Sequence, residues 1–170
     1  DVFEPPLKGC DMAYYDLREF MEACDDAGEM ITIDQEVDWN LEAGAISRRI
    51  CEVGAPMAFM PKVRGIKNGA SILGSPLSKG WRTDFSRLAL TLQLDPEASY
   101  HTLMEEIVQR LANPVRPLQV KEGPCKENII KGTDINLFDF PAPYLHEGDG
   151  GRYIDTFGVT ACKDPDSDWV

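Results

Sequence analysis

The chain has 170 residues and a formal net charge of −12, with 29 acidic and 17 basic side chains. Hydrophobic residues make up 43% of it, which is typical of a globular domain and not of a disordered segment. The acidic balance repels phosphate backbones, so nucleic acid is excluded as an expected partner. No apolar run approaches the roughly 18 residues that span a bilayer, and no signal peptide is visible. These features predict a cytoplasmic protein with no membrane partner.

The five cysteines lie far apart in the sequence, at Cys10, Cys24, Cys51, Cys125 and Cys162. An odd number without any CxxC spacing argues against a disulfide framework and against a zinc site. We therefore interpret them as reduced thiols, in agreement with a cytoplasmic location.

Three segments have the apolar spacing i, i+3, i+4, i+7 of amphipathic helices, namely residues 16–27, 41–53 and 100–111. Asp16 is expected to cap the first helix and Asn40 the second. The third is expected to bury one inner stripe along its length, formed by Leu103, Ile107, Val108 and Leu111. A shorter helix is expected within residues 84–94.

Three shorter apolar runs predict strands at residues 30–33, 57–60 and 71–73. The pair Asn68–Gly69 is a strong hairpin signal, and it predicts pairing between residues 63–66 and 71–73. Together with the helices, the strands predict an α/β (α+β) class: an N-terminal mixed α/β domain over residues 1–113.

The sequence changes character after residue 113. Residues 114–150 are rich in proline and have little periodicity, which predicts an extended connector. Residues 153–162 have a strand pattern, residues 164–167 a turn pattern, and a second strand is expected to start at Trp169. Residues 151–170 are therefore predicted to be the first strands of a second domain.

No short motif forms an active site by itself. The sequence GDGGR at residues 148–152 lacks the strand–loop–helix context of a phosphate-binding loop and is interpreted as a tight turn. The alternating aspartates of residues 164–168 lack the glycine and the closing glutamate of a calcium loop, so they also predict a solvated turn. His101 is interpreted as a surface or packing residue, and His146 as a loop residue that forms hydrogen bonds.

Two long stretches together carry a family resemblance: LEAGAISRRICE, and GPCKENIIKGTDINLFDFPAPYLHEGDGGRYIDTFGVTACKDPDSDW. Their order and spacing resemble the UbiD-like family of reversible non-oxidative decarboxylases, and within it the ferulic or cinnamic acid decarboxylases of fungi. The resemblance covers roughly residues 16–169. It implies that the α/β domain is followed by the start of a split-β-barrel domain that binds a flavin.

The resemblance also implies cofactors and partners. They are prenylated FMN, a divalent metal (Mn or Mg) and potassium, with a small aromatic or α,β-unsaturated carboxylic acid as substrate. Assembly as a homo-oligomer is expected through a C-terminal domain that these residues do not include.

Two positions match the family's site residues. By resemblance, Thr156 lines the prenylated-flavin pocket, and the backbone carbonyl of Trp169 coordinates potassium. No catalytic residue is expected in this chain, because the family's catalytic and divalent-metal positions are expected beyond Val170. The 170 residues alone are therefore expected to be inactive.

Two alternatives stay open from the sequence. The chain is alternatively a non-catalytic assembly subunit or fragment of the same family. It is alternatively a flavin reductase-like protein, since split barrels also serve in that class.

Overall fold

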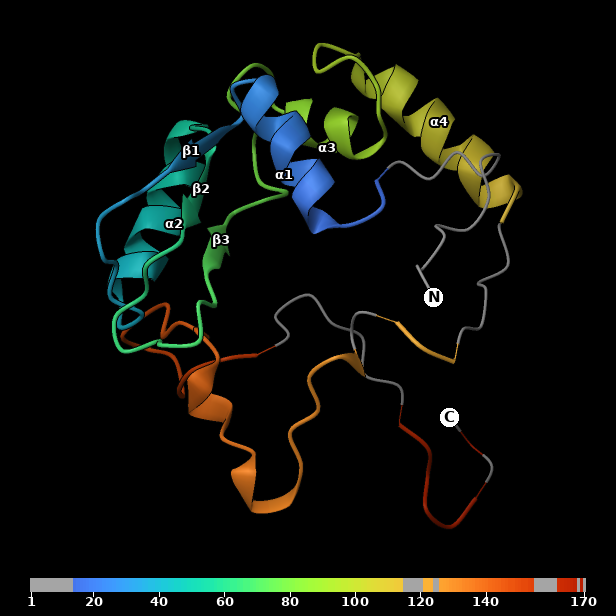
Figure 1. Cartoon of the computed structure of the whole chain (residues 1–170). Coiled ribbons are helices and arrows are strands. Elements are labelled where there is room, and N and C mark those ends of the chain that lie inside the picture. Colours follow the sequence, from blue (N-terminus) through green and yellow to red (C-terminus); the bar gives the residue numbers. More distant parts are fainter. Residues whose placement is uncertain (1–13, 115–120, 124–125, 155–161, 168, 170) are drawn as a thin grey trace.

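The computed structural model describes residues 14–114, 121–123, 126–154, 162–167 and 169. Its elements follow the order α1 (Leu17–Asp26), β1 (Met30–Thr32), α2 (Glu42–Val53), β2 (Met57–Met60), β3 (Ile72–Gly74), α3 (Ser86–Thr91), α4 (Tyr100–Ala112), η2 (Gly132–Asp134) and η3 (Leu137–Asp139). Figure 1 shows α1, α2 and α3 beside a small sheet and α4 farther out, with the segment that carries η2 and η3 extending away from the sheet. The predicted mixed α/β class is confirmed. In the described part, no helix is both long and apolar enough to cross a bilayer.

The sheet has three strands in the order β1-β2-β3. β1 pairs with β2 in parallel, with Met30 opposite Met57, and β2 pairs with β3 in antiparallel, with Phe59 opposite Leu73. Parallel neighbours need a crossover connection, and α2 provides it between β1 and β2.

The predicted hairpin partner is wrong. Residues 63–66 do not pair with β3; β2 does. The backbone around Val63 is engaged elsewhere, because the Val37 amide donates to the Lys62 carbonyl at 2.9 Å and the Arg64 amide donates to the Val37 carbonyl at 2.9 Å. The chain does bend at Asn68, whose side chain accepts from the Ala70 amide at 3.0 Å, and Gly69 has a φ of 78°. Asn68 and Gly69 therefore lie within a longer loop that joins β2 to β3, and not in a tight hairpin turn.

The two faces of β2 bury different helices, as the two-residue period of a strand requires. Ala58 and Met60 face one way and form a cluster with Ile50 of α2. Met57 faces the other way, and it packs with Phe20 of α1 and Leu90 of α3. The short sheet is therefore covered on both faces.

The caps of α1 and α2 differ in how far they agree with the sequence predictions. Asp16 caps α1 as expected, and its carboxylate accepts from the amides of Arg18 and Glu19. The Asn40 cap is wrong. Leu41 occupies the cap position of α2 with a φ of 68° and provides no side-chain hydrogen bond.

The fully buried stripe expected along α4 is also wrong. Leu103 is completely buried, whereas Val108 and Leu111 are 66% and 75% exposed. Apolar periodicity marks one face of a helix, but burial also needs a partner for that face. In Figure 1, α4 runs outward at the edge of the helices, away from the sheet.

A buried ion pair holds the region between β1 and α3. Glu29, which directly precedes β1, is fully buried. Its carboxylate accepts from the Ser86 hydroxyl at 2.5 Å, from the amides of Trp81 and Arg82 at 2.8 Å each, and from the Arg87 guanidinium at 3.1 Å. All four contacts come from one stretch of chain, so Glu29 fixes the path of residues 81–87.

Arg87 is also fully buried, and it extends the same network. Its guanidinium donates to the Ala55 carbonyl at 3.1 Å, the Ser78 hydroxyl at 2.7 Å and the Lys79 carbonyl at 2.5 Å. Buried charges need such partners, because an unpaired ion in a protein interior costs several kcal/mol.

Removing the charge of Glu29 is expected to destabilise the fold strongly. All four groups that face this carboxylate are donors, so the amide nitrogen of Glu29→Gln would oppose a donor and leave Arg87 uncompensated. We expect a loss of about 3–5 kcal/mol in the free energy of unfolding, measured by urea denaturation. The matched control is Glu52→Gln, which breaks exposed pairs with Arg48 and Arg49 and is expected to leave the midpoint unchanged. Equal midpoints for the two variants would contradict the role of Glu29.

The same carboxylate predicts a pH dependence. Burial alone would raise the pKa of Glu29, but the Ser86 hydroxyl, the Trp81 and Arg82 amides and the Arg87 guanidinium outweigh it and lower the pKa below 4.5. A carboxyl with a lowered folded pKa contributes stability above its unfolded pKa, and loses that contribution as pH falls through the folded value. The free energy of unfolding should therefore fall more steeply with acidification below pH 4.5 in the native protein than in Glu29→Gln. Parallel pH profiles would contradict this.

Candidate functional site

The segment after η3 returns to the α/β body and docks next to the start of α2. The Tyr144 amide donates to the Trp39 carbonyl at 3.0 Å, and the Leu41 amide donates to the Tyr144 carbonyl at 2.9 Å. A third contact joins the β2–β3 loop, where the Asn68 side chain donates to the Asp139 carbonyl at 3.1 Å. These hydrogen bonds attach the predicted connector to the body through its backbone.

Close approach at this junction depends on a glycine in α2. A Cβ on Gly44 would overlap the Leu145 carbonyl oxygen and lie 2.8 Å from the Leu145 Cα. Gly44 is itself buried within the helix. A glycine inside a helix is unfavourable by about 1 kcal/mol relative to alanine, so its presence here is explained by the contact with the backbone of residue 145.

The loop that follows is closed by local hydrogen bonds. The His146 amide donates to the Asp149 carboxylate at 3.0 Å, and the Asp149 amide donates back to the His146 carbonyl at 3.0 Å. The Tyr144 hydroxyl donates to the Glu147 carbonyl at 2.8 Å. The imidazole of His146 lies 3.5 Å from the Asp149 carboxylate. His146 is thus a loop residue, as interpreted, and GDGGR begins in the turn over residues 146–149 and continues as bends.

The other histidine lies on α4, where its ring is 3.2 Å from the Glu105 carboxylate and 83% exposed. His101 is thus a surface residue, in agreement with its interpretation.

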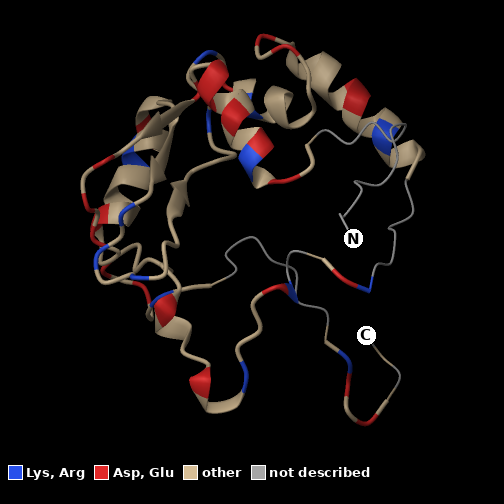
Figure 2. Ribbon diagram, in the orientation of Figure 1, with Lys and Arg blue, Asp and Glu red and all other residues tan. Residues whose placement is uncertain are grey.

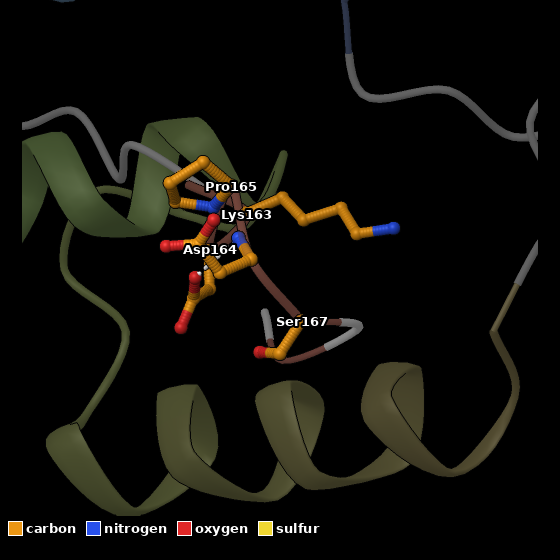
Figure 3. A pocket seen from close by; sticks show the side chains of 5 residues that line it. Lys163, Asp164, Pro165 and Ser167 are labelled. Carbon is orange, nitrogen blue, oxygen red and sulfur yellow. Dashed lines mark hydrogen bonds between the residues drawn. The ribbon is translucent and has the colours of Figure 1, made fainter.

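The C-terminal turn, with residues 151–154, belongs to the described part of the predicted flavin-binding segment. Figure 3 shows a hollow lined by residues 163–167, in which the Lys163 side chain extends away from the Asp164 carboxylate. The Asp164 carboxylate accepts from the Asp166 amide at 2.7 Å, and the Asp164 amide donates to the Trp169 carbonyl at 3.0 Å. The predicted turn is therefore present.

The two predicted site residues have different outcomes. Thr156 lies outside the described residues, as does most of the strand predicted over residues 153–162. Trp169 is described, and its side chain is 75% exposed. Its carbonyl accepts a hydrogen bond from the Asp164 amide at 3.0 Å.

A divalent metal finds no ligand set among the described residues. No group of three or more His, Cys, Asp or Glu side chains converges there in a way that could hold an ion. Figure 2 shows the acidic residues scattered over helices and loops.

Two family matches cover most of the chain. Residues 21–107 match the 3-octaprenyl-4-hydroxybenzoate carboxy-lyase N-terminal domain, and residues 116–170 match the Rift-related domain of the same carboxy-lyases. The chain belongs to the UbiD-like family. The resemblance recognised in the sequence is thereby confirmed.

Individual members of the UbiD-like family are similar over nearly the whole chain. The pyrrole-2-carboxylic acid decarboxylase of Pseudomonas aeruginosa is 37% identical over 159 residues, and ferulic acid decarboxylase 1 of Saccharomyces cerevisiae is 34% identical over 161 residues. Each match covers 91% of this chain but only 32% of the relative. The chain thus spans about a third of the length of these curated relatives.

Solved structures of the family have the same fold. The vanillic acid decarboxylase of Sedimentibacter hydroxybenzoicus in its open form matches with a TM-score of 0.73 and 34% identity, over 83% of this chain and 30% of that one. An evolved dimeric form of HmfF from Pelotomaculum thermopropionicum, solved in complex with prFMN, matches with a TM-score of 0.68 and 25% identity, over 91% of this chain and 34% of that one.

Sequence reasoning missed the docking residues. Gly44 offered a signal, because a glycine inside a helical pattern often marks a packing constraint. Tyr144 and Trp39 offered none, since their contact joins distant parts of the sequence.

Replacing Gly44 by alanine is expected to release the docked segment. The added Cβ improves helix propensity but overlaps the backbone of Leu145. We expect Gly44→Ala to speed hydrogen exchange of the Leu41 and Tyr144 amides by roughly tenfold or more, which corresponds to ~1.4 kcal/mol of local stability. The control is Gly148→Ala, where a Cβ meets no atom within 4 Å. Unchanged exchange in Gly44→Ala would contradict the docking role.

Proposed function

We propose that this chain is the N-terminal portion of a reversible non-oxidative decarboxylase that uses prenylated FMN. The carrying observation is that two consecutive domains of one carboxy-lyase family match along the chain in order. Relatives named for pyrrole-2-carboxylic acid and ferulic acid support an aromatic or α,β-unsaturated carboxylic acid as substrate. The HmfF complex with prFMN supports the cofactor.

We propose the three-part division of the chain that the sequence predicts. Residues 1–113 form the N-terminal α/β domain, residues 114–150 the connector, and residues 151–170 the first strands of the flavin-binding split barrel. We further propose a cytoplasmic homo-oligomer. Thr156 is assigned to the flavin pocket and the Trp169 carbonyl to potassium, while the described residues alone do not provide a divalent-metal site.

The chemistry of the reaction explains the need for the cofactor. Loss of carbon dioxide from an sp² carbon leaves an electron pair on that carbon. Prenylated FMN, when bound, supplies the centre that accepts it. The part proposed for this chain is to form one wall of the cofactor site and to attach it to the α/β body. No residue of these 170 is proposed as the proton donor.

The test uses the full encoded protein that contains these residues, purified and loaded with prenylated FMN. It is incubated in D₂O with cinnamic, ferulic and pyrrole-2-carboxylic acids. We expect carbon dioxide release from at least one acid, with one deuterium in the product at the former carboxyl position, because a proton replaces the carboxylate. Cofactor alone and protein loaded with FMN are the controls.

The alternatives give different results in the same test. A flavin reductase would oxidise a nicotinamide cofactor and release no carbon dioxide. A non-catalytic assembly subunit would retain no flavin. Either outcome, without turnover of any acid, would overturn the proposal.

The assignment of Thr156 predicts a cofactor-binding defect. In the full encoded protein, Thr156→Phe is expected to weaken binding of prenylated FMN by about tenfold or more, or ~1.4 kcal/mol, because a bulky ring would occupy the pocket. Asp155→Phe is the control, since adjacent strand residues point to opposite faces, and it should lose less. Flavin absorbance after purification measures loading, and a thermal melt checks folding. Full loading of Thr156→Phe with loss in Asp155→Phe would show that the assignment is out of register by one residue.

A further inference from the structure

Arg152 occupies a cage of aromatic rings and backbone carbonyls at the junction between the docked segment and the α/β body. The central carbon of its guanidinium lies 4.3 Å from the centroid of the Trp39 ring and 5.5 Å from that of Phe138. Its Nε donates to the Ala142 carbonyl at 2.6 Å, and its Nη2 donates to the Phe140 carbonyl at 2.8 Å. One side chain therefore contacts both the body and the segment that docks on it.

The sequence of the docked segment explains why a guanidinium is needed there. Phe140 and Ala142 each precede a proline, Pro141 or Pro143. A residue before proline is held extended, and proline itself has no amide hydrogen to donate. The carbonyls of Phe140 and Ala142 thus belong to a stretch with few backbone donors of its own. The planar fork of Arg152 satisfies both carbonyls at once while its face stacks on Trp39.

Trp39 makes this cage part of the main junction. Its carbonyl accepts from the Tyr144 amide at 3.0 Å, while its ring lies under Arg152. Two residues of the docked segment, Tyr144 and Arg152, therefore contact the same tryptophan. Among the described residues, Arg152 forms no ion pair with a carboxylate, so carbonyls and rings hold it.

We infer that Arg152 is a positioning residue for the cofactor-binding part of the protein. Arg152 attaches the chain to Trp39 directly before the predicted flavin-binding strand, and Thr156 follows it by four residues. A displacement of Arg152 would also move its covalent neighbours Tyr153 and Ile154. This inference rests on the proposed function for its consequence in cofactor binding, but the cage itself stands on the described contacts.

The decisive variant is Arg152→Lys in the full encoded protein. Lysine keeps the positive charge, but it cannot donate as a planar fork to two carbonyls while stacking on a ring. Trp39→Leu removes the stacking surface from the other side, and the double variant tests whether the two act as one unit. Arg48→Lys is the matched control, because Arg48 lies exposed on α2 and pairs with Glu52.

The first measurement is hydrogen exchange, which needs no cofactor. Arg152→Lys and Trp39→Leu are each expected to speed exchange of the Tyr144 amide at least about tenfold, and the double variant should add little further. The interior of α2 should stay protected in all variants. Unchanged exchange at Tyr144 in Arg152→Lys would overturn the inference.

The second measurement is binding of FMN as the probe, followed by flavin absorbance and circular dichroism. We expect Arg152→Lys to weaken FMN about tenfold and to alter the dichroism of the remaining bound flavin, with an unchanged melting temperature. Native affinity and an unchanged flavin spectrum, despite faster exchange, would reduce Arg152 to a purely structural residue and overturn the inference. Failure of the native protein to bind any flavin would instead refute the proposed function, while the exchange result still decides whether Arg152 positions the segment.

Discussion

The buried pair of Glu29 and Arg87 is the interaction on which the α/β body depends. The strands are three or four residues long, too short for a sheet that is stable without helices packed on it. Desolvation makes such a pair expensive, so its main effect is to specify one arrangement and not to add net stability. It fixes the path of residues 78–87, and this path brings Leu90 of α3 onto Met57 of β2. Without it, one face of the sheet would lose the part of its cover that α3 provides.

The junction between the docked segment and the α/β body also depends on polar contacts, but these are weaker than the buried ion pair. The segment over residues 129–140 exposes most of its large apolar side chains, so hydrophobic burial does not hold it to the body. What holds it are the backbone hydrogen bonds of Tyr144, the close approach at Gly44 and the Arg152 cage. Contacts of this kind fix direction and register with little buried area. They suit a segment whose task is to place the residues that follow it.

Local sequence signals predicted the helices and strands well. Strand pairing and helix burial were predicted less well, because they depend on contacts between distant residues. The α1 cap was predictable because Asp16 bonds to amides only two and three residues away. The partner of β3 was not, because Val37, far from the predicted hairpin, takes the hydrogen bonds of residues 62–64. The α4 stripe failed at Val108 and Leu111 for a related reason. Periodicity defines a face, but only the rest of the fold determines whether that face is covered.

The site residues show the same limit more sharply. Thr156 and Trp169 came from family resemblance, since no spacing in the sequence singles them out. Arg87 lies 58 residues from Glu29, and Arg152 contacts Trp39 across an even longer stretch, so no helical or strand period connects either pair. The acidic residues of the described part are scattered over helices and loops (Figure 2), while each internal junction includes one arginine. An arginine bound to carbonyls or to a buried carboxylate cannot be replaced by lysine, because the geometry of its fork and not its charge makes the junction.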